Sequence, residues 1–268
     1  LVISKGPVYA VVPNVVDMSQ AEAEAAIVAA GLVVGTLTEE YSGTVVPGNV
    51  ISQNPSAGEE ALHGSGVNLV ISTVMGWVYI NDAGVSGHED FNGYMSKYET
   101  TNAAYCQFLN AALASADITV SGNYVRGAIG SNSGPDYAGK LYYNGYGPGE
   151  SFRGATNGGA SRIHYIDGVF RVDSGFEHYP VTYVTWYGAT AFCNYYGYRL
   201  PTEWEWQAVA DYDGSYDYGC GTSISSSTAN ISSSTHPDGT SIVGSFGTYG
   251  YGMCDMAGNV WEWTSSIY

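Results

Sequence analysis

The run from Tyr249 to Ser266, YGYGMCDMAGNVWEWTSS, gathers the side chains of this sequence that are best suited to do chemistry. Glycines at positions 250, 252 and 258 break any helical stripe of apolar residues, so the run is not predicted to be a helix. We expect a loop that leads into a strand over residues 259–263, where side chains alternate between two faces. Trp261 and Trp263 would then anchor the strand from one face, and Glu262 would point to the other.

Charge is scarce in the chain and almost all of one sign. The 268 residues hold 25 acidic and 8 basic side chains, which give a formal net charge of −17 and a pI near 4.3. Such a chain repels nucleic acid and anionic membranes, so neither is expected as a partner. Hard cations are its natural counterions, and sites built from carboxylate and carbonyl oxygens suit calcium. Taken alone, the net charge is better explained by a solvated acidic surface than by a calcium site.

The rest of the composition favours an extracellular protein. Hydrophobic residues make up 45% of the chain, which is enough for a globular core, and we expect no membrane span because no apolar run is long enough. At the surface, 24 tyrosines and 36 glycines, with many Ser, Thr and Asn residues, replace the usual lysine and glutamate. No signal peptide is present, so the chain is expected to be soluble or already processed.

Residues 9–73 are punctuated as one compact unit. Ser19 is a predicted N-cap, with Glu22 completing a capping box, and the helix is predicted to end at Gly31. Two strand-like runs follow, around 45–53 and 67–73, separated by a turn-rich region. The pattern predicts a helix packed on a small sheet.

This unit, through VPNVVDMSQAEAEAAIVAAGLVVG and GNVISQNPSAGEEALHGSGVNLVIST, resembles a PASTA repeat. The resemblance implies a small α/β module over residues 9–74, of a kind found in extracellular tandem arrays of bacterial surface proteins. Some such repeats bind muropeptides or β-lactams and many only space other domains, so a spacer is favoured and a ligand-binding role stays open. LVIS at Leu1–Ser4 repeats LVIS at Leu69–Ser72, and residues 1–8 are interpreted as a strand left from a preceding repeat.

From Trp77 onward the sequence turns rich in Gly, Tyr and Asn. A capped amphipathic helix is predicted from near Thr101, a second over WYGATAFCNYYG, and a third after Thr202, which forms a capping box with Glu205. The run IHYIDGVFRV predicts a hairpin that turns at residues 167 and 168. Loops are expected to dominate the remainder.

Three segments of this region, in order, look like the formylglycine-generating enzyme, or sulfatase-modifying factor, domain: MSKYETTNAAYCQFLNA, YPVTYVTWYGATAFCNYYGYRLPTEWEWQAVA and VGSFGTYGYGMCDMAGNVWEWTSS. The resemblance covers residues 77–268 and implies an α+β, loop-rich relative of the C-type lectin fold. It also implies a calcium loop, with the Asp255 and Glu262 carboxylates and the Gly258 and Val260 carbonyls as ligands. A second calcium loop maps less securely onto Asn230, the Ile231 carbonyl, Asp238 and the Thr240 carbonyl. A hydrogen-bonded loop without metal is the competing interpretation.

The family's oxidising members bind copper through two cysteines in a segment that follows the WEW run, and no such segment follows here before Tyr268. Copper is therefore not expected, and an enzyme is the less favoured interpretation. Cys106 and Cys193 lie on predicted helices and are expected in the core. Cys220 and Cys254 lie in loops beside the calcium positions, and we predict a disulfide between them.

Two further patterns bear on zinc binding and glycosylation. The five histidines show no zinc-binding spacing. Asn230-Ile231-Ser232 is an N-glycosylation sequon, which makes a glycoprotein an expectation that competes with the calcium role of Asn230.

Three functions follow. The favoured one is a non-catalytic, calcium-braced extracellular or bacterial surface protein that builds structures, including filaments. The others are a formylglycine-generating oxidase whose catalytic segment is missing, and a module that binds a cell-wall or surface glycan or a peptide. The surplus strand at Leu1–Ser4, set against an incomplete second domain, predicts head-to-tail polymers; a fragment trimmed at both ends explains the same features.

Overall fold

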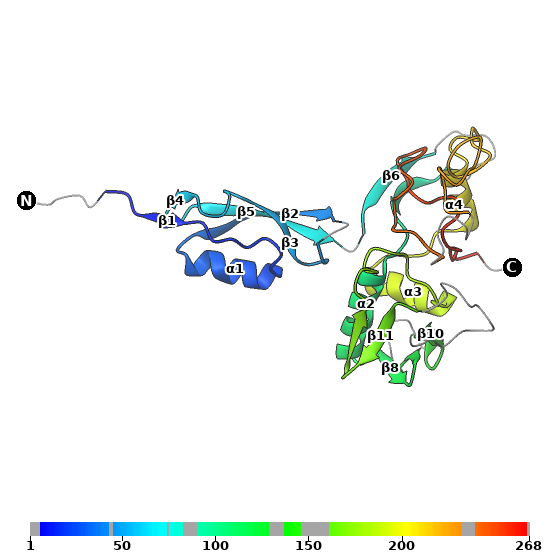
Figure 1. The fold of residues 1–268 in the computed structure, drawn as a ribbon, viewed down its shortest axis with the longest axis horizontal. Helices are drawn as coiled ribbons and strands as arrows, with labels where there is room; N and C mark the ends of the chain where they lie inside the picture. Colours follow the sequence, from blue (N-terminus) through cyan, green and yellow to red (C-terminus); the bar gives the residue numbers. More distant parts are fainter. Residues whose placement is uncertain are drawn as a thin grey trace, which may run out of the picture. The chain divides into compact units, whose positions relative to one another are not determined.

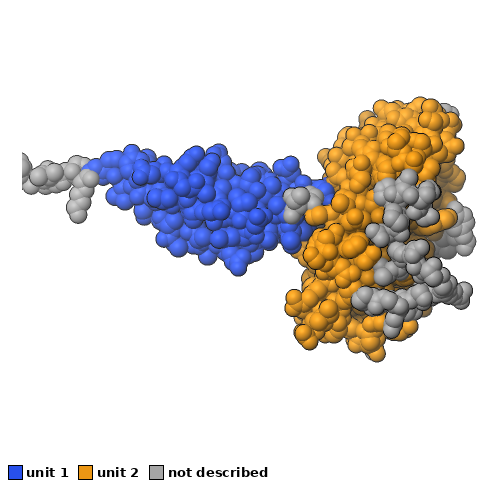
Figure 2. Space-filling view, in the orientation of Figure 1, with its two compact units in different colours: residues 1–76 blue, residues 77–268 orange. Residues whose placement is uncertain are grey.

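The computed structural model describes residues 6–42, 45–73, 75–82, 90–128, 137–145, 161–231 and 239–266. The chain divides into two compact units, Leu1–Gly76 and Trp77–Tyr268, which are distinguished by colour in Figure 2. Both units mix helices and strands, which confirms the predicted α+β class. The proposed leftover strand at Leu1–Ser4 lies outside the described residues.

Unit 1 is a helix on a small sheet, as predicted (Figure 1). Its elements are β1 (Tyr9–Val11), α1 (Gln20–Ala29), β2 (Val33–Tyr41), β3 (Val50–Asn54), β4 (Glu60–Leu62) and β5 (Gly66–Thr73). The main sheet has the order β2-β5-β3, in which β5 is parallel to β2 and antiparallel to β3, while β1 pairs with β4. Ala23 and Ile27 of α1 are buried against a core that includes Val67 of β5.

The ends of α1 are set by the residues that the sequence indicates. Ser19 Oγ accepts a hydrogen bond from the Glu22 N–H at 3.4 Å, and Glu22 Oε2 accepts one from the Ser19 N–H at 3.1 Å. Gly31 follows the helix with φ of 79°, and a Cβ there would lie 2.5 Å from His63 Nε2. The predicted capping box and helix end are both confirmed.

Unit 2 has ten described elements, which are β6 (Trp77–Asn81), β7 (Asn92–Ser96), α2 (Asn102–Ala114), β8 (Ile118–Ser121), β9 (Tyr124–Gly127), β10 (Leu141–Asn144), β11 (Ile163–Ile166), β12 (Val169–Val172), α3 (Trp186–Tyr195) and α4 (Glu203–Ala210). The strands form small antiparallel sheets, β6-β7, β10-β9-β8 and β11-β12. The predicted hairpin is present, with Asp167 and Gly168 at φ of 52° and 86° between β11 and β12.

The three predicted helices of unit 2 are present and begin at threonine caps. Thr101, Thr185 and Thr202 each accept a hydrogen bond from a backbone N–H three residues later. Helices α2 and α3 meet through aromatic rings, and Tyr105, Phe108 and Phe192 have ring centroids 5.3 to 5.8 Å apart. Gly188 lets α3 approach β10, because a Cβ there would lie 2.2 Å from the Tyr142 carbonyl oxygen.

A second core, in unit 2, holds the run from Tyr249 to Ser266 in place through its two methionines. Met253 and Met256 pack with Ile80 of β6 and with Val209 and Ala210 of α4. The predicted strand over residues 259–263 is wrong: none of these described residues is in a strand or a bridge, and the nearest pairing is a single bridge between Gly258 and Asn230. No described helix is both long and apolar enough to cross a bilayer.

Candidate functional site

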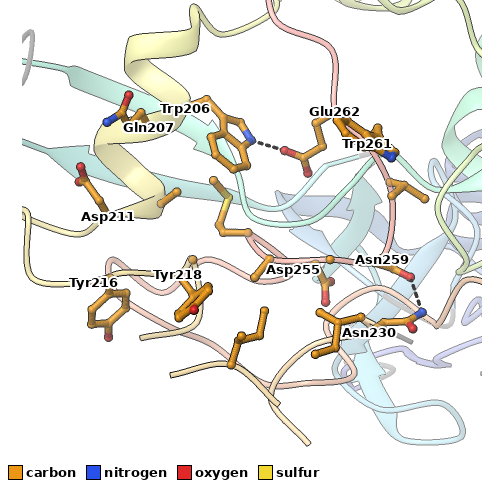
Figure 3. Close-up of a pocket in the computed structure, with 18 of the residues that line it drawn as sticks. Trp206, Gln207, Asp211, Tyr216, Tyr218, Asn230, Asp255, Asn259, Trp261 and Glu262 are labelled. Atoms are coloured by element: carbon orange, nitrogen blue, oxygen red, sulfur yellow. Dashed lines mark hydrogen bonds between the residues drawn. The ribbon is translucent and has the colours of Figure 1, made fainter. Parts of the chain in front are cut away.

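A pocket of about 990 Å³ lies between α4 and the stretch from Asp255 to Thr264 (Figure 3). Helix α4 supplies Trp206 and Gln207, and the loop after α4 supplies Tyr216 and Tyr218. The other side is built by the 255–264 stretch and by the loop of Asn230 and Ile231. The described residues that line the pocket therefore supply aromatic rings, amides and carboxylates, and none of them is a lysine or arginine.

The backbone turns sharply between Asp255 and Asn259, and these turns bring polar groups to the pocket. Asp255, Gly258 and Asn259 have φ of 56°, 82° and 59°, in the left-handed region that glycine and asparagine tolerate best. The Asn259 N–H donates to the Asn230 carbonyl at 2.9 Å. A Cβ at position 258 would lie 2.4 Å from that same carbonyl oxygen, so the close approach of the two loops requires glycine.

The Asn259 side chain is the hub of the site. Its Oδ1 accepts hydrogen bonds from the Ser241 N–H at 2.8 Å and from Asn230 Nδ2 at 3.1 Å. Its Nδ2 donates to Glu99 Oε2 at 2.6 Å. One amide thus joins three loops that are distant in the sequence.

Three carboxyl groups gather around this hub. Asp255 and Glu99 are 8% and 9% exposed, and Glu262 lines the pocket. Asp255 Oδ2 accepts from the Gly244 N–H at 2.5 Å, and Glu262 accepts from Trp206 Nε1. Glu99 Oε1 is buried and accepts no hydrogen bond from the part of the chain that the structure describes. None of the ion pairs in the described part of the chain involves these three residues.

All three acids have raised pKa values, and burial is the largest cause for each. Burial, followed by the charges of Glu262 and Asp255, raises the pKa of Glu99 well above its ordinary value. Burial raises the pKa of Asp255 as well, against the opposing hydrogen bond from Gly244. The protein around Glu262 desolvates its carboxylate and raises its pKa to about 7, although the residue opens onto the pocket.

The chemistry of these groups fits a hard cation, although their present side-chain orientations do not converge. Carboxylates and carbonyls are oxygen ligands, and a buried carboxylate oxygen without a donor is costly unless a proton or cation meets it. Within the described ranges, however, no three acidic, histidine or cysteine side chains are grouped as metal ligands. The Asp255 carboxylate turns to the Gly244 N–H. The Glu262 carboxylate turns to the Trp206 indole (Figure 3).

The predicted site residues fall into three groups. The structure brings Asp255, Gly258, Val260, Glu262, Asn230 and Ile231 to one pocket. Thr240 is described but does not line the pocket, and Asp238 lies outside the described residues. Glu99 was missed, because nothing in its polar surroundings in the sequence marks it as a partner of a loop so far along the chain.

The predicted anchoring by both indoles is wrong in part. Trp263 is held by a hydrogen bond from its Nε1 to the Val184 carbonyl at 3.0 Å. Trp261 is fully exposed, at 101% of its reference area. The alternation that the prediction assumed fails because the chain here is a loop with left-handed residues.

Residues 87–268 match the model of the sulfatase-modifying factor enzyme 1-like domain, and residues 10–73 match the PASTA domain. The chain belongs to the sulfatase-modifying factor family and carries a PASTA domain before its family domain. The suggested resemblances are both confirmed.

This sulfatase-modifying factor chain is similar in sequence to proteins of different kinds. The serine/threonine-protein kinase pkn1 of Chlamydia caviae is 42% identical over 110 residues, which is 40% of this chain and 17% of the kinase. The formylglycine-generating enzyme of Thermomonospora curvata is 37% identical over 101 residues, or 32% of this chain and 33% of that enzyme. The inactive C-alpha-formylglycine-generating enzyme 2 of Bos taurus is 36% identical over 102 residues, or 34% of each.

These matches cover only parts of the proteins concerned. The sulfatase-modifying factor chain spans 17% to 34% of the length of these curated relatives. Among solved structures, a three-PASTA-domain segment of a Ser/Thr kinase from Staphylococcus aureus aligns at 25% identity with a TM-score of 0.26. It covers 42% of this chain and 47% of that one.

All four cysteines of this sulfatase-modifying factor chain lie in described residues, and all four are free thiols. The predicted disulfide between Cys220 and Cys254 is therefore not formed. Cys220 Sγ instead lies 3.8 Å from both the Ser223 carbonyl and Thr228 Oγ1. Burial and the charge of Asp255 raise the pKa of Cys254 to about 11, which keeps this thiol protonated.

The asparagine of the predicted glycosylation sequon, Asn230, is held by hydrogen bonds inside the sulfatase-modifying factor domain. Asn230 is 7% exposed, and its Nδ2 donates to the Gly239 carbonyl at 2.9 Å and to Asn259. An amide nitrogen held inside the site is a poor acceptor for a glycan. Ser232, which completes the sequon, lies outside the described residues.

Proposed function

We propose that this chain is a non-catalytic extracellular module in which calcium braces the loops of the sulfatase-modifying factor domain. One observation carries the proposal: three carboxyl groups, of which two are buried, surround the Asn259 hub with no cationic partner among the described residues. Calcium would supply the two positive charges that this arrangement lacks. The raised pKa values of these acids agree with such a need for positive charge.

The residues that would hold the ion come from two segments. Asp255 and Glu262 would contribute carboxylates, and Gly258 and Val260 would contribute carbonyl oxygens. Glu99 joins them as a third carboxylate, held by the hydrogen bond from Asn259. A second calcium ion would be held by Asn230 and Asp238 and by the carbonyl oxygens of Ile231 and Thr240.

A non-catalytic role agrees with the state of three cysteines. Burial raises the pKa of Cys106 and Cys193 to about 11, as it does for Cys254, so none of these three is a reactive thiolate near neutral pH. Sequence similarity does not separate the two possibilities, because an active and an inactive enzyme match at 37% and 36% identity. If copper-loaded protein converted a cysteine-containing peptide to formylglycine, the oxidase interpretation would replace this one.

An extracellular location and a building role complete the proposal. The PASTA match, the kinases that share sequence with this chain and the Tyr-rich, Lys-poor composition support the location. Head-to-tail assembly is the building role that we propose. Light scattering on purified protein tests it, because a monomer at all concentrations would contradict assembly while leaving calcium binding untouched.

Calcium binding itself is tested by isothermal titration calorimetry on protein first stripped with a chelator. We expect saturable binding that is lost in Asp255→Asn and weakened in Glu99→Gln. Glu60→Gln on β4 of unit 1 changes the net charge equally and should bind like the wild type. Equal binding by all three variants would show that the ions meet only the general acidic surface.

A further inference from the structure

The β6–β7 hairpin has an inner face in the core and an outer face in water. On the inner face Ile80 is fully buried and Val78 and Met95 pack beside it. The outer face consists of three cross-strand pairs, which are Trp77 with Ser96, Tyr79 with Tyr94 and Asn81 with Asn92. Because the inner face already packs on the core of unit 2, the outer aromatic rings are not needed to form that core.

These outer rings are unusually exposed. Tyr94, Tyr79 and Trp77 are 68%, 51% and 42% exposed. Aromatic side chains bring large apolar area, so leaving three of them in water along one strip forgoes burial that a ligand could restore. The pairs occupy five successive residues of β6 and span about 13 Å at the rise of an antiparallel strand.

The rings and the neighbouring amide are held in place before any ligand arrives. The Tyr79 and Tyr94 rings lie 5.3 Å apart at 56°, and Trp77 packs edge-on against Tyr198 at 4.7 Å. The Tyr79 hydroxyl donates to Asn92 Oδ1 at 2.7 Å. This bond fixes the Asn92 amide, so that its NH₂ group is the donor end available to a ligand.

The chemistry of the strip selects its ligand. None of its six residues is charged, in a chain whose net charge is −17. A charged partner would find no matching charge there, and a wholly apolar one would bury the Asn92 amide without a new acceptor. A neutral sugar ring fits both demands, because its C–H face packs on an aromatic ring while its hydroxyls accept and donate hydrogen bonds at the rim.

We propose that the outer face of β6–β7 binds a neutral oligosaccharide. The Tyr79 and Tyr94 rings together form one stacking position, Trp77 offers the next one along the strip, and Asn92 donates to a hydroxyl. The length of the strip favours a chain of sugars over a single one. This site is separate from the calcium loops and does not depend on them.

Isothermal titration calorimetry with cellohexaose, chitohexaose and maltohexaose on the full chain tests the site. We expect saturable binding of at least one of these probes, equal in calcium-loaded and chelated protein. Tyr94→Ala should weaken that binding about tenfold or more, and Asn92→Ala by a smaller factor. Tyr124→Ala, which removes a 41% exposed tyrosine from β9 of the same unit, is the matched control and should bind normally.

Two readouts guard against a misfolded variant. Tryptophan fluorescence reports folding of unit 2, and amide chemical shifts of the wild-type protein should move on β6 and β7 when the sugar is added. Absence of binding to all three sugars overturns the proposal, as does unchanged binding by Tyr94→Ala. A dimer that Tyr94→Ala dissociates in the absence of sugar would assign the face to a second copy and would also overturn it.

Discussion

Asn259 Nδ2 donates to Glu99 Oε2 at 2.6 Å across 160 residues of sequence. The bond joins the loop after Met256 to the segment that leads into α2. Glu99 is buried and Asn259 is half-buried, and the charges of Glu262 and Asp255 both act on Glu99. The stability of unit 2 should therefore depend on this contact.

Replacement of Asn259 should destabilise unit 2 in a way that depends on the substitute. Asn259→Ala removes the amide donor from Glu99 and leaves the Ser241 N–H without its acceptor, and we expect a loss of about 2 to 4 kcal/mol in the free energy of unfolding. Asn230 Nδ2 keeps its hydrogen bond to the Gly239 carbonyl. Asn259→Asp keeps the acceptor but turns the donor into a carboxylate beside Glu99. It should therefore lose more stability near neutral pH than in acid.

Urea unfolding followed by tryptophan fluorescence measures both variants. All six tryptophans lie in unit 2, so this signal does not report on the PASTA unit. If Asn259→Asp proved as stable as the wild type at neutral pH, the charge crowding around Glu99 would be unimportant.

Metal-free protein should lose stability as the pH rises toward neutrality. The Glu262 pKa is about 7 in the folded state against an ordinary value of 4.5, and the pKa values of Glu99 and Asp255 are raised too. Between these values the folded state binds more protons than the unfolded state, so the free energy of unfolding falls with rising pH. Below the ordinary pKa the penalty is absent, and above the folded pKa it is complete.

The contribution of Glu262 is partly screened, because the residue opens onto the pocket. Glu262→Gln should flatten the pH dependence of chelated protein over the range from about 5 to about 7. Glu60→Gln in unit 1 should leave it unchanged. A stability that rises over this range in wild-type protein would contradict the assignment.

Removal of calcium should lower the melting temperature of unit 2 while sparing unit 1. A ligand that binds only the folded state stabilises it by about 2.7 kcal/mol at a hundred times its dissociation constant. Scanning calorimetry with and without a chelator should show the shift in the transition that coincides with the tryptophan signal. An identical transition in both samples would exclude calcium as a brace.

The parts of the fold that short-range chemistry decides could be predicted from the sequence. Ser19 with Glu22, and Thr202 with Glu205, mark helix starts because each capping box closes within four residues. β2 was not predicted: most of its residues are exposed without a regular alternation, and its pairing with β5 is irregular between Val34 and Leu37. No local pattern separates such an edge strand from a loop.

Only the site residues that lie together in one segment of the sequence could be predicted. Asp255 and Glu262 lie seven positions apart in a recognisable run, and the structure places both at the pocket. The role of Glu99 depends on a contact with Asn259 made by the tertiary fold, which no spacing records. The predicted strand failed for a similar reason, since a strand needs a neighbour and the described chain offers this stretch none.

The thiols give the last prediction, which concerns the disulfide that the loops suggested. Unfolding the protein in an alkylating reagent, without a reductant, should label all four cysteines, because the structure holds each as a free thiol.

In the native protein Cys254 should react slowly. With a pKa of about 11 its thiolate fraction at pH 8 is about a hundredfold or more below that of an ordinary cysteine. Asp255→Asn removes one of the charges that raise this pKa and should speed the reaction, whereas Glu60→Gln should not. Mass spectrometry of the labelled peptides decides the matter: a peptide pair linking Cys220 to Cys254 would restore the disulfide and show that the thiol contacts of Cys220 do not persist in solution.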